Sequence, residues 1–135
     1  MKAFPILKKY SSLFIKTEPQ AITEELLNKL KKDFGLYYFQ NTLTKKIDYV
    51  GTSTGKSGIK GRVKNQHLSA GYKKSVFRIK LMTEKKILSE KDSVYFIKEN
   101  YAIGIIYMPE HKSIIKALEQ VLIFEYLPKF NSESA

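Results

Sequence analysis

Two tyrosines stand beside glycines in a way that could make their phenols chemical groups. Residues 35–37 read Gly-Leu-Tyr, and residues 49–51 read Tyr-Val-Gly. A strand pair requires β-branched or aromatic residues on its packed face, but it does not require tyrosines next to glycines. Because a phenol has a pKa near ~10, Tyr37 or Tyr49 could act as a base only if cations or a metal ion lowered that pKa. The alternative for each tyrosine alone is packing, with the ring buried and one partner for its hydroxyl.

Arg62 is the residue best suited to hold a phosphate. It is one of two arginines among 24 basic residues, and its segment, residues 58–67, directly follows a Gly/Ser/Thr turn. A helix N-terminus after glycines is a natural phosphate site, and a guanidinium can clamp a phosphate under attack. Lys56, Lys60 and Lys64 flank Arg62 as further candidate nucleic-acid contacts. For Lys60 and Lys64 we favour a solvated basic face or a contact to the nucleic-acid backbone alone.

His67 is the last residue of this segment, five residues after Arg62. On an ideal helix the two side chains would be about 140° apart, so His67 joins the same site only if the helix ends or tightens there. A proton acceptor in an active site and a capping histidine are equally consistent with this position.

Two carboxylates in the C-terminal helical pattern are candidates for a metal ligand. Glu119 and Glu125 both fall among apolar positions when this segment is placed on a helix. A carboxylate on an apolar face requires a partner, and a metal ion is one candidate. Helix capping or pairing with a lysine is the alternative for either residue, and periodicity does not separate the two.

The composition places these residues in one small, basic domain. With 135 residues, 43% of them hydrophobic, the chain can form one compact core, so we expect a single domain over residues 1–135. The net charge of +11 favours a polyanionic partner, although a lysine-rich surface explains such a charge as well. No apolar run reaches membrane-spanning length, and no cysteine is present. Together with a poor secretory signal at the N-terminus, these features favour a cytoplasmic protein.

Local patterns predict the elements that would position these residues. Residues 1–12 read as an irregular or extended lead-in, and Thr23 caps a helix that ends near residue 35. Residues 94–98 fit a helix or a strand equally well. Strands are expected at 36–40, 47–51 and 102–108, and helices at 59–68, at 74–82 with Val76, Ile79 and Leu81 as its apolar set, and from 109 to about 126. The pattern predicts an α/β or α+β domain with a sheet of about three strands flanked by helices.

In their order along the chain, these pieces resemble the GIY-YIG nuclease superfamily. The resemblance rests on the two glycine-tyrosine triplets, Arg62, a histidine, and Glu119 on a helix followed by Pro128 and Asn131. It covers residues 34–131, the expected catalytic core, and leaves residues 1–33 as an N-terminal lead-in and helix. Each triplet alone is a weak signal, whereas the ordered set is more specific. The resemblance also favours Glu119 over Glu125.

This resemblance implies a small antiparallel three-stranded sheet flanked by helices, and metal-dependent hydrolysis of DNA phosphodiester bonds. It implies that Tyr37 is the general base for the attacking water or orients that water. Tyr49 would assist Tyr37 or hold the scissile phosphate. Arg62 would stabilise the charge that develops on phosphorus.

The remaining implied roles concern proton transfer and the metal ion. His67 would accept a proton or form a hydrogen bond near Tyr37. Glu119 would bind one Mg²⁺ or Mn²⁺, and Asn131 would support that arrangement. One carboxylate is enough for Mg²⁺, because this ion keeps most of its waters and takes phosphate oxygens as ligands.

Two other functions stay open on the sequence. One is a basic module on the same fold that binds nucleic acid without catalysis, and the other is a lysine-rich structural or protein-interaction domain. We expect DNA as the partner and no membrane. Because the sequence has no obvious separate DNA-binding domain, specificity would come from loops of this domain, from a homodimer or from a protein partner.

Overall fold

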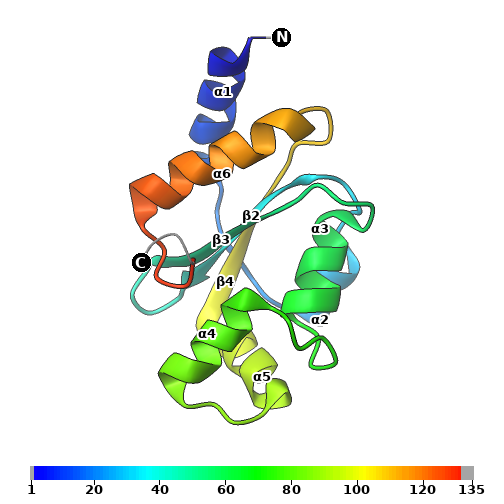
Figure 1. Cartoon of the computed structure of the whole chain (residues 1–135), viewed down its shortest axis with the longest axis vertical. Coiled ribbons are helices and arrows are strands. Elements are labelled where there is room, and N and C mark those ends of the chain that lie inside the picture. The colour runs from blue at the N-terminus through cyan, green and yellow to red at the C-terminus, as the bar shows by residue number, and fades with distance from the viewer. Residues whose placement is uncertain (1, 132–135) are drawn as a thin grey trace.

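The computed structural model describes residues 2–131, and its elements are shown in Figure 1. The ends of the expected domain, residue 1 and residues 132–135, lie outside the described residues. In chain order the elements are α1 (Ala3–Lys16), β1 (Gln20–Ala21), α2 (Glu24–Asn28), β2 (Gly35–Asn41), β3 (Ile47–Ser53), α3 (Gly58–Lys60), the π-helix η1 (Gly61–His67), α4 (Val76–Lys85), α5 (Glu90–Asn100), β4 (Tyr101–Tyr107) and α6 (Lys112–Tyr126).

The strands form one antiparallel sheet with the order β1-β4-β2-β3. The expected α+β class is confirmed, but the expectation of three strands is wrong, because the sheet has four. The additional strand, β1, pairs only Gln20 with Ile103 and Ala21 with Ala102. A strand of two residues has no alternating pattern that a sequence could show. Strand β2 is paired on both sides, whereas β3 is an edge strand.

Two segments are helical where the sequence predicted something else or left the choice open. The expected irregular lead-in is wrong, because α1 begins at Ala3 and buries Tyr10 and Phe14. Pro5 is tolerated there because it lies in the first turn of α1, where a backbone N–H would have no intrahelical acceptor. The segment around Val94 belongs to helix α5, whose N-cap Ser89 accepts a hydrogen bond from the backbone of Asp92.

Two other helices differ in their details. Thr23 caps α2 as predicted, but α2 ends at Asn28, earlier than expected. Of the apolar set expected for α4, only Leu81 is buried, while Val76 and Ile79 are 45% and 48% exposed. Phe77 and Arg78 take the buried face of α4 instead, because Arg78 finds hydrogen-bond acceptors there.

Alternation along the strands separates the core into two clusters on opposite faces of the sheet. Tyr37 and Tyr49 point to the face covered by α2, α3, η1, α4 and α5. Leu36, Tyr38 and Val50 point to the face covered by α1 and α6 (Figure 1). The two phenols of interest therefore lie under η1 and α4, and α6 lies on the other side of the sheet. Among residues 2–131, no helix combines the length and apolar character needed to span a bilayer.

The glycine that follows Tyr49 and Val50 is required by the phenol on the neighbouring strand. Tyr37 pairs directly with Gly51 across β2 and β3. A Cβ atom on Gly51 would lie 2.4 Å from the hydroxyl oxygen of Tyr37, well inside contact distance. The Tyr37 ring thus crosses the backbone of β3 where no side chain stands.

We expect Gly51→Ala to reduce the free energy of unfolding by about 2 kcal/mol, because the added methyl group must displace a fully buried ring. Urea unfolding measures this change. Gly55→Ala is the control, since a Cβ on Gly55 meets no atom within 4 Å. Equal effects of the two substitutions would contradict the packing described here.

Candidate functional site

The candidate site lies at the outer edge of β3, where η1 from one face of the sheet approaches α6 from the other. Two neighbouring hollows open there. The first, about 290 Å³, is lined by Arg62 and Gln66 of η1 together with the end of β3 and the following turn. The second, about 170 Å³, is lined by Tyr49, Glu119 and Asn131 among others. Lys116 of α6 lines both hollows and so lies between them.

The π-helix η1 decides whether His67 belongs to this site. Its wide turns include a hydrogen bond from the backbone N–H of Leu68 to the carbonyl of Val63, five residues earlier. Because the turns of a π-helix are wider than those of an α-helix, residues five positions apart lie closer to the same side than they would in an α-helix. The spacing between Arg62 and His67 therefore suits a common site because the helix widens. The sequence required the helix to end or tighten at His67; η1 does end at His67, and it widens rather than tightens.

His67 forms a short hydrogen bond with Tyr37 in the buried interior. The distance between His67 Nε2 and the Tyr37 hydroxyl oxygen is 2.6 Å, and both side chains are buried. Burial, together with the positive charges of Arg62 and Arg78, lowers the pKa of His67 to about 3. His67 is therefore a neutral imidazole at pH 7, with one ring nitrogen available as an acceptor.

Tyr37 is a protonated phenol in this environment. Burial raises its pKa, and the Tyr49 phenol raises it as well, whereas the Arg62 guanidinium lowers it and Glu119 raises it slightly further. The Tyr37 and Tyr49 rings have centroids 6.4 Å apart. Tyr37 is fully enclosed, while Tyr49 is 8% exposed and lines the second hollow. Tyr49 is thus the phenol nearer to solvent.

Arg62 presents hydrogen-bond donors that the protein leaves partly unused. Its Nη1 donates to the side-chain oxygen of Gln66 at 3.3 Å, and its buried Nε has no acceptor among the described residues. Burial alone would lower the pKa of Arg62, but the neighbouring phenols of Tyr37, Tyr49 and Tyr72 together raise it. A charged guanidinium with free donors in a hollow is suited to bind an anion.

The lysines near Arg62 point to different places. Lys60 and Lys64 both donate to Asn28 of α2, to its backbone carbonyl at 3.3 Å and to its side-chain oxygen at 2.7 Å. Lys56 is exposed in the turn before α3. Of the four basic residues that the sequence proposed as nucleic-acid contacts, Arg62 is the one that lines the first hollow.

The two candidate carboxylates of α6 lie in different environments. Glu119 is 13% exposed, lines the second hollow and is 3.6 Å from the Lys116 ammonium, which is itself 66% exposed. Glu125 is exposed on another side of the helix. The structure therefore separates two positions that periodicity left equivalent, and it brings Glu119 to the site.

Asn131 holds the end of the described chain against the open edge of β3. Its side-chain oxygen accepts from the backbone N–H of Val50 at 2.9 Å, and its side-chain nitrogen donates to the Val50 carbonyl at 2.8 Å. The backbone N–H of Phe130 donates to the carbonyl of Asp48. Because both amide atoms are committed to β3, Asn131 positions Tyr49 and the second hollow and is not suited to ligate a metal ion.

Glu119 is the carboxylate at this site that could hold a divalent ion. Within residues 2–131, no group of three or more His, Cys, Asp and Glu side chains gathers to hold an ion. Glu119 offers one carboxylate at a polar hollow, and its ion-pair partner Lys116 is largely exposed to solvent. Mg²⁺ binds in this manner with water and phosphate oxygens as its other ligands.

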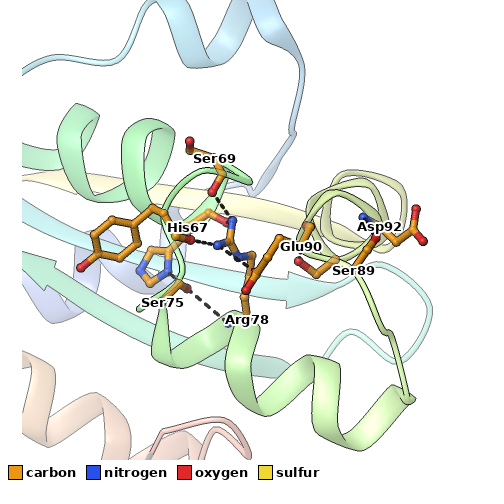
Figure 2. Close-up of polar contacts among 9 residues, drawn as sticks. His67, Ser69, Ser75, Arg78, Ser89, Glu90 and Asp92 are labelled. Carbon is orange, nitrogen blue, oxygen red and sulfur yellow. Dashed lines mark hydrogen bonds and ion pairs between the residues drawn. The ribbon is translucent and has the colours of Figure 1, made fainter.

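Arg78 and Ser75 belong to the surroundings of this site and were not singled out by the sequence. Arg78 is buried and donates to the backbone carbonyls of His67, Ser69 and Tyr72, and it forms a 3.2 Å ion pair with Glu90. Figure 2 shows this guanidinium between the loop after η1 and Glu90 of α5. Arg78 is the second of only two arginines, and that rarity was the signal that could have identified it.

Comparisons with protein-family models, with curated proteins and with solved structures found no match to this chain.

His67 makes the stability of the fold sensitive to acid. Its folded-state pKa is lowered to about 3, so between about pH 6.5 and pH 3 the unfolded chain binds a proton that the folded protein does not. The stabilisation is fully present above pH 6.5 and is lost as the pH falls through this window. We expect the protonation of His67 in the unfolded chain to lower the free energy of unfolding by about 2 kcal/mol between pH 6.5 and pH 5.

Urea unfolding at several pH values, compared between the wild type and His67→Gln, measures this contribution. The substituted protein should lose that part of the pH dependence, and His111→Gln, at the other histidine, should retain it. A His67→Gln profile parallel to the wild type would show that His67 is not a neutral buried group.

Proposed function

We propose that this protein is a metal-dependent endonuclease that hydrolyses DNA phosphodiester bonds. The observation that supports this function best is the convergence of Arg62, Tyr49 and Glu119 on two adjoining hollows, with the Tyr37–His67 pair directly behind them. These groups come from β2, β3, η1 and α6, so no local pattern brings them together. The net charge of +11 favours a polyanionic substrate.

In the proposed reaction Arg62 binds the scissile phosphate, because its charged side chain lines the first hollow. Water attacks phosphorus, and its proton passes to the Tyr37 oxygen while the Tyr37 proton passes to His67 Nε2. The bond from phosphorus to the leaving nucleoside oxygen breaks, and that oxygen takes a proton from solvent. Glu119 would hold the divalent ion, which stabilises negative charge on the phosphate oxygens.

The described conformation requires one movement before Tyr37 can meet water. Tyr37 is fully enclosed, and the Arg62 guanidinium lies close enough to lower its pKa. Engagement of a phosphate by Arg62 would draw the guanidinium toward the hollow and open the Tyr37 hydroxyl. Tyr49, which already reaches the second hollow, would contact the phosphate or the water directly.

Replacement of the Glu119 carboxylate tests the proposed function. We expect Glu119→Gln to reduce Mg²⁺- or Mn²⁺-dependent nicking of supercoiled plasmid by on the order of 10²-fold or more, because the neutral amide binds a divalent ion much more weakly than the carboxylate does. Glu125→Gln is the matched control, since it makes the same change at an exposed position of the same helix. Equal nicking by wild type and Glu119→Gln would remove the assigned role of Glu119.

A basic module that binds DNA without cleaving it is the second candidate. It is favoured by the ion pair between Lys116 and Glu119, in which a lysine stands where the ion would bind. In a nuclease the Lys116 ammonium would compete with the metal ion for Glu119. In a binding module the ion pair between Lys116 and Glu119 would simply persist. Salt-dependent DNA affinity is expected in both cases, so binding alone does not separate them.

Lys116→Met separates the two candidates. For a nuclease we expect it to tighten Mn²⁺ binding to the DNA-free protein about three- to tenfold, because a competing charge near Glu119 is removed. Lys112→Met makes the same charge change on the same helix, but Lys112 lies over the Phe34 ring, so we expect unchanged Mn²⁺ affinity. Calorimetric titration measures both. Absence of Mn²⁺ binding and of cleavage, with DNA binding retained, would favour the second candidate.

A further inference from the structure

We propose that Ser75 is a positioning residue that fixes His67 as the tautomer with the proton on Nδ1, so that Nε2 accepts the proton of Tyr37. The tautomer is inferred from the two hydrogen bonds of His67 and the charges at either end of them, and its consequence for catalysis rests on the nuclease function proposed above. A chain of buried polar groups carries this inference. It runs from Arg62 through Tyr37 and His67 to Ser75, the N-cap of α4.

Both ring nitrogens of His67 have a short hydrogen-bond partner. Nε2 is 2.6 Å from the Tyr37 hydroxyl oxygen, and Nδ1 is 2.6 Å from the Ser75 hydroxyl oxygen. Because His67 is neutral, one nitrogen donates and the other accepts. Two arrangements are therefore available. Either Tyr37 donates to Nε2 and Nδ1 donates to Ser75, or both hydrogen bonds run in the opposite direction.

The charge of Arg62 favours the first arrangement. A guanidinium can only donate, so the Tyr37 oxygen is more stable with its lone pairs toward Arg62 and its proton toward His67. At the other end of the chain, the charge of Arg78 is compensated by Glu90 at 3.2 Å and by three backbone carbonyls. Arg62 Nη1 instead donates to the neutral side chain of Gln66. The less compensated charge thus stands at the Tyr37 end and orients the chain.

Ser75 is well placed to accept the proton of Nδ1. It is buried, and its hydroxyl oxygen already accepts the backbone N–H of Arg78 at 3.2 Å, as an N-cap does. This second contact directs the lone pairs of the oxygen. The Arg78 guanidinium fastens the carbonyls of the loop between His67 and Ser75, and its ion pair links α4 to Glu90 at the start of α5 (Figure 2). The pair of helices α4 and α5 therefore holds the acceptor in place.

The assigned tautomer is the one that the proposed reaction requires. His67 can take the Tyr37 proton only if Nε2 carries a lone pair, and the imidazolium that forms keeps its Nδ1–H bonded to Ser75. The opposite tautomer would direct an N–H at the Tyr37 oxygen and would block the transfer. Ser75 therefore acts through His67 and does not touch the substrate.

Ser89 offers a control that separates positioning from helix capping. Its hydroxyl oxygen accepts the backbone N–H of Asp92 at 3.0 Å, so it caps α5 in the same way that Ser75 caps α4 (Figure 2). Ser89→Ala removes a comparable cap without touching His67. Ser75→Thr retains the hydroxyl, and Ser75→Gly removes it while keeping a residue that is tolerated at an N-cap.

The experiment is ¹⁵N NMR of the histidine rings at pH 7, because protonated and unprotonated ring nitrogens have well-separated chemical shifts. Only two histidines are present, so His111→Gln assigns the signals. We expect the wild type, Ser75→Thr and Ser89→Ala to show a protonated Nδ1 on His67. Ser75→Ala and Ser75→Gly should show a mixture of tautomers or a protonated Nε2. Plasmid nicking by these two should fall on the order of tenfold or more, while Ser89→Ala keeps the wild-type rate.

A protonated Nε2 in the wild type, or a wild-type pattern in Ser75→Gly, would overturn the proposal. If Ser75→Ala does not fold, Ser75→Gly and Ser75→Thr still decide the result. Loss of the tautomer in a protein that never cleaves DNA would support the role of Ser75 and reject the nuclease function. Cleavage of DNA together with an unchanged tautomer in Ser75→Gly would support the nuclease function and reject the role of Ser75.

Discussion

The close approach of the Tyr37 ring to the backbone of Gly51 is the contact on which the candidate site depends. Tyr37 stands on the central strand β2, which is paired along both edges, so its backbone has little freedom to shift. With Gly51 opposite, the ring lies across β3 and brings its hydroxyl to His67 beneath η1. The positions of His67 and Arg62 around this phenol follow from how η1 packs on the sheet, and Tyr49 stands beside it on β3.

Burial keeps the two central groups neutral, while charged side chains stand around them: Arg78 is buried and paired with Glu90, and the others lie at the rim. Desolvation raises the pKa of Tyr37 and lowers that of His67, so neither group carries a charge at pH 7. The charged side chains at the rim, Arg62, Lys116 and Glu119, line the two hollows. In the proposed reaction, an anion and a metal ion would change the local field so that this neutral phenol–imidazole pair passes a proton.

The site draws on both faces of the sheet because β3 is an edge strand. η1 reaches the edge from one face and α6 from the other, and the tail that ends in Asn131 covers part of the edge between them. A central strand would have kept these two layers apart. The same elements cover part of the β3 edge, which would otherwise be free to pair with another chain.

The sequence by itself determined the hairpin of β2 and β3, the Thr23 cap, the α+β class and the identity of Tyr37, Arg62 and Glu119 as candidates, because these depend on local pattern and residue chemistry. Tertiary structure decided the rest. The two-residue strand β1 and the buried face of α4 are set by partners far along the chain. The widening of η1, the difference between Glu119 and Glu125, and the linkage of Arg78 and Ser75 to His67 likewise depend on packing between elements. Periodicity describes one helix at a time, whereas the charge and hydrogen-bond partners of a side chain are set by what packs against it.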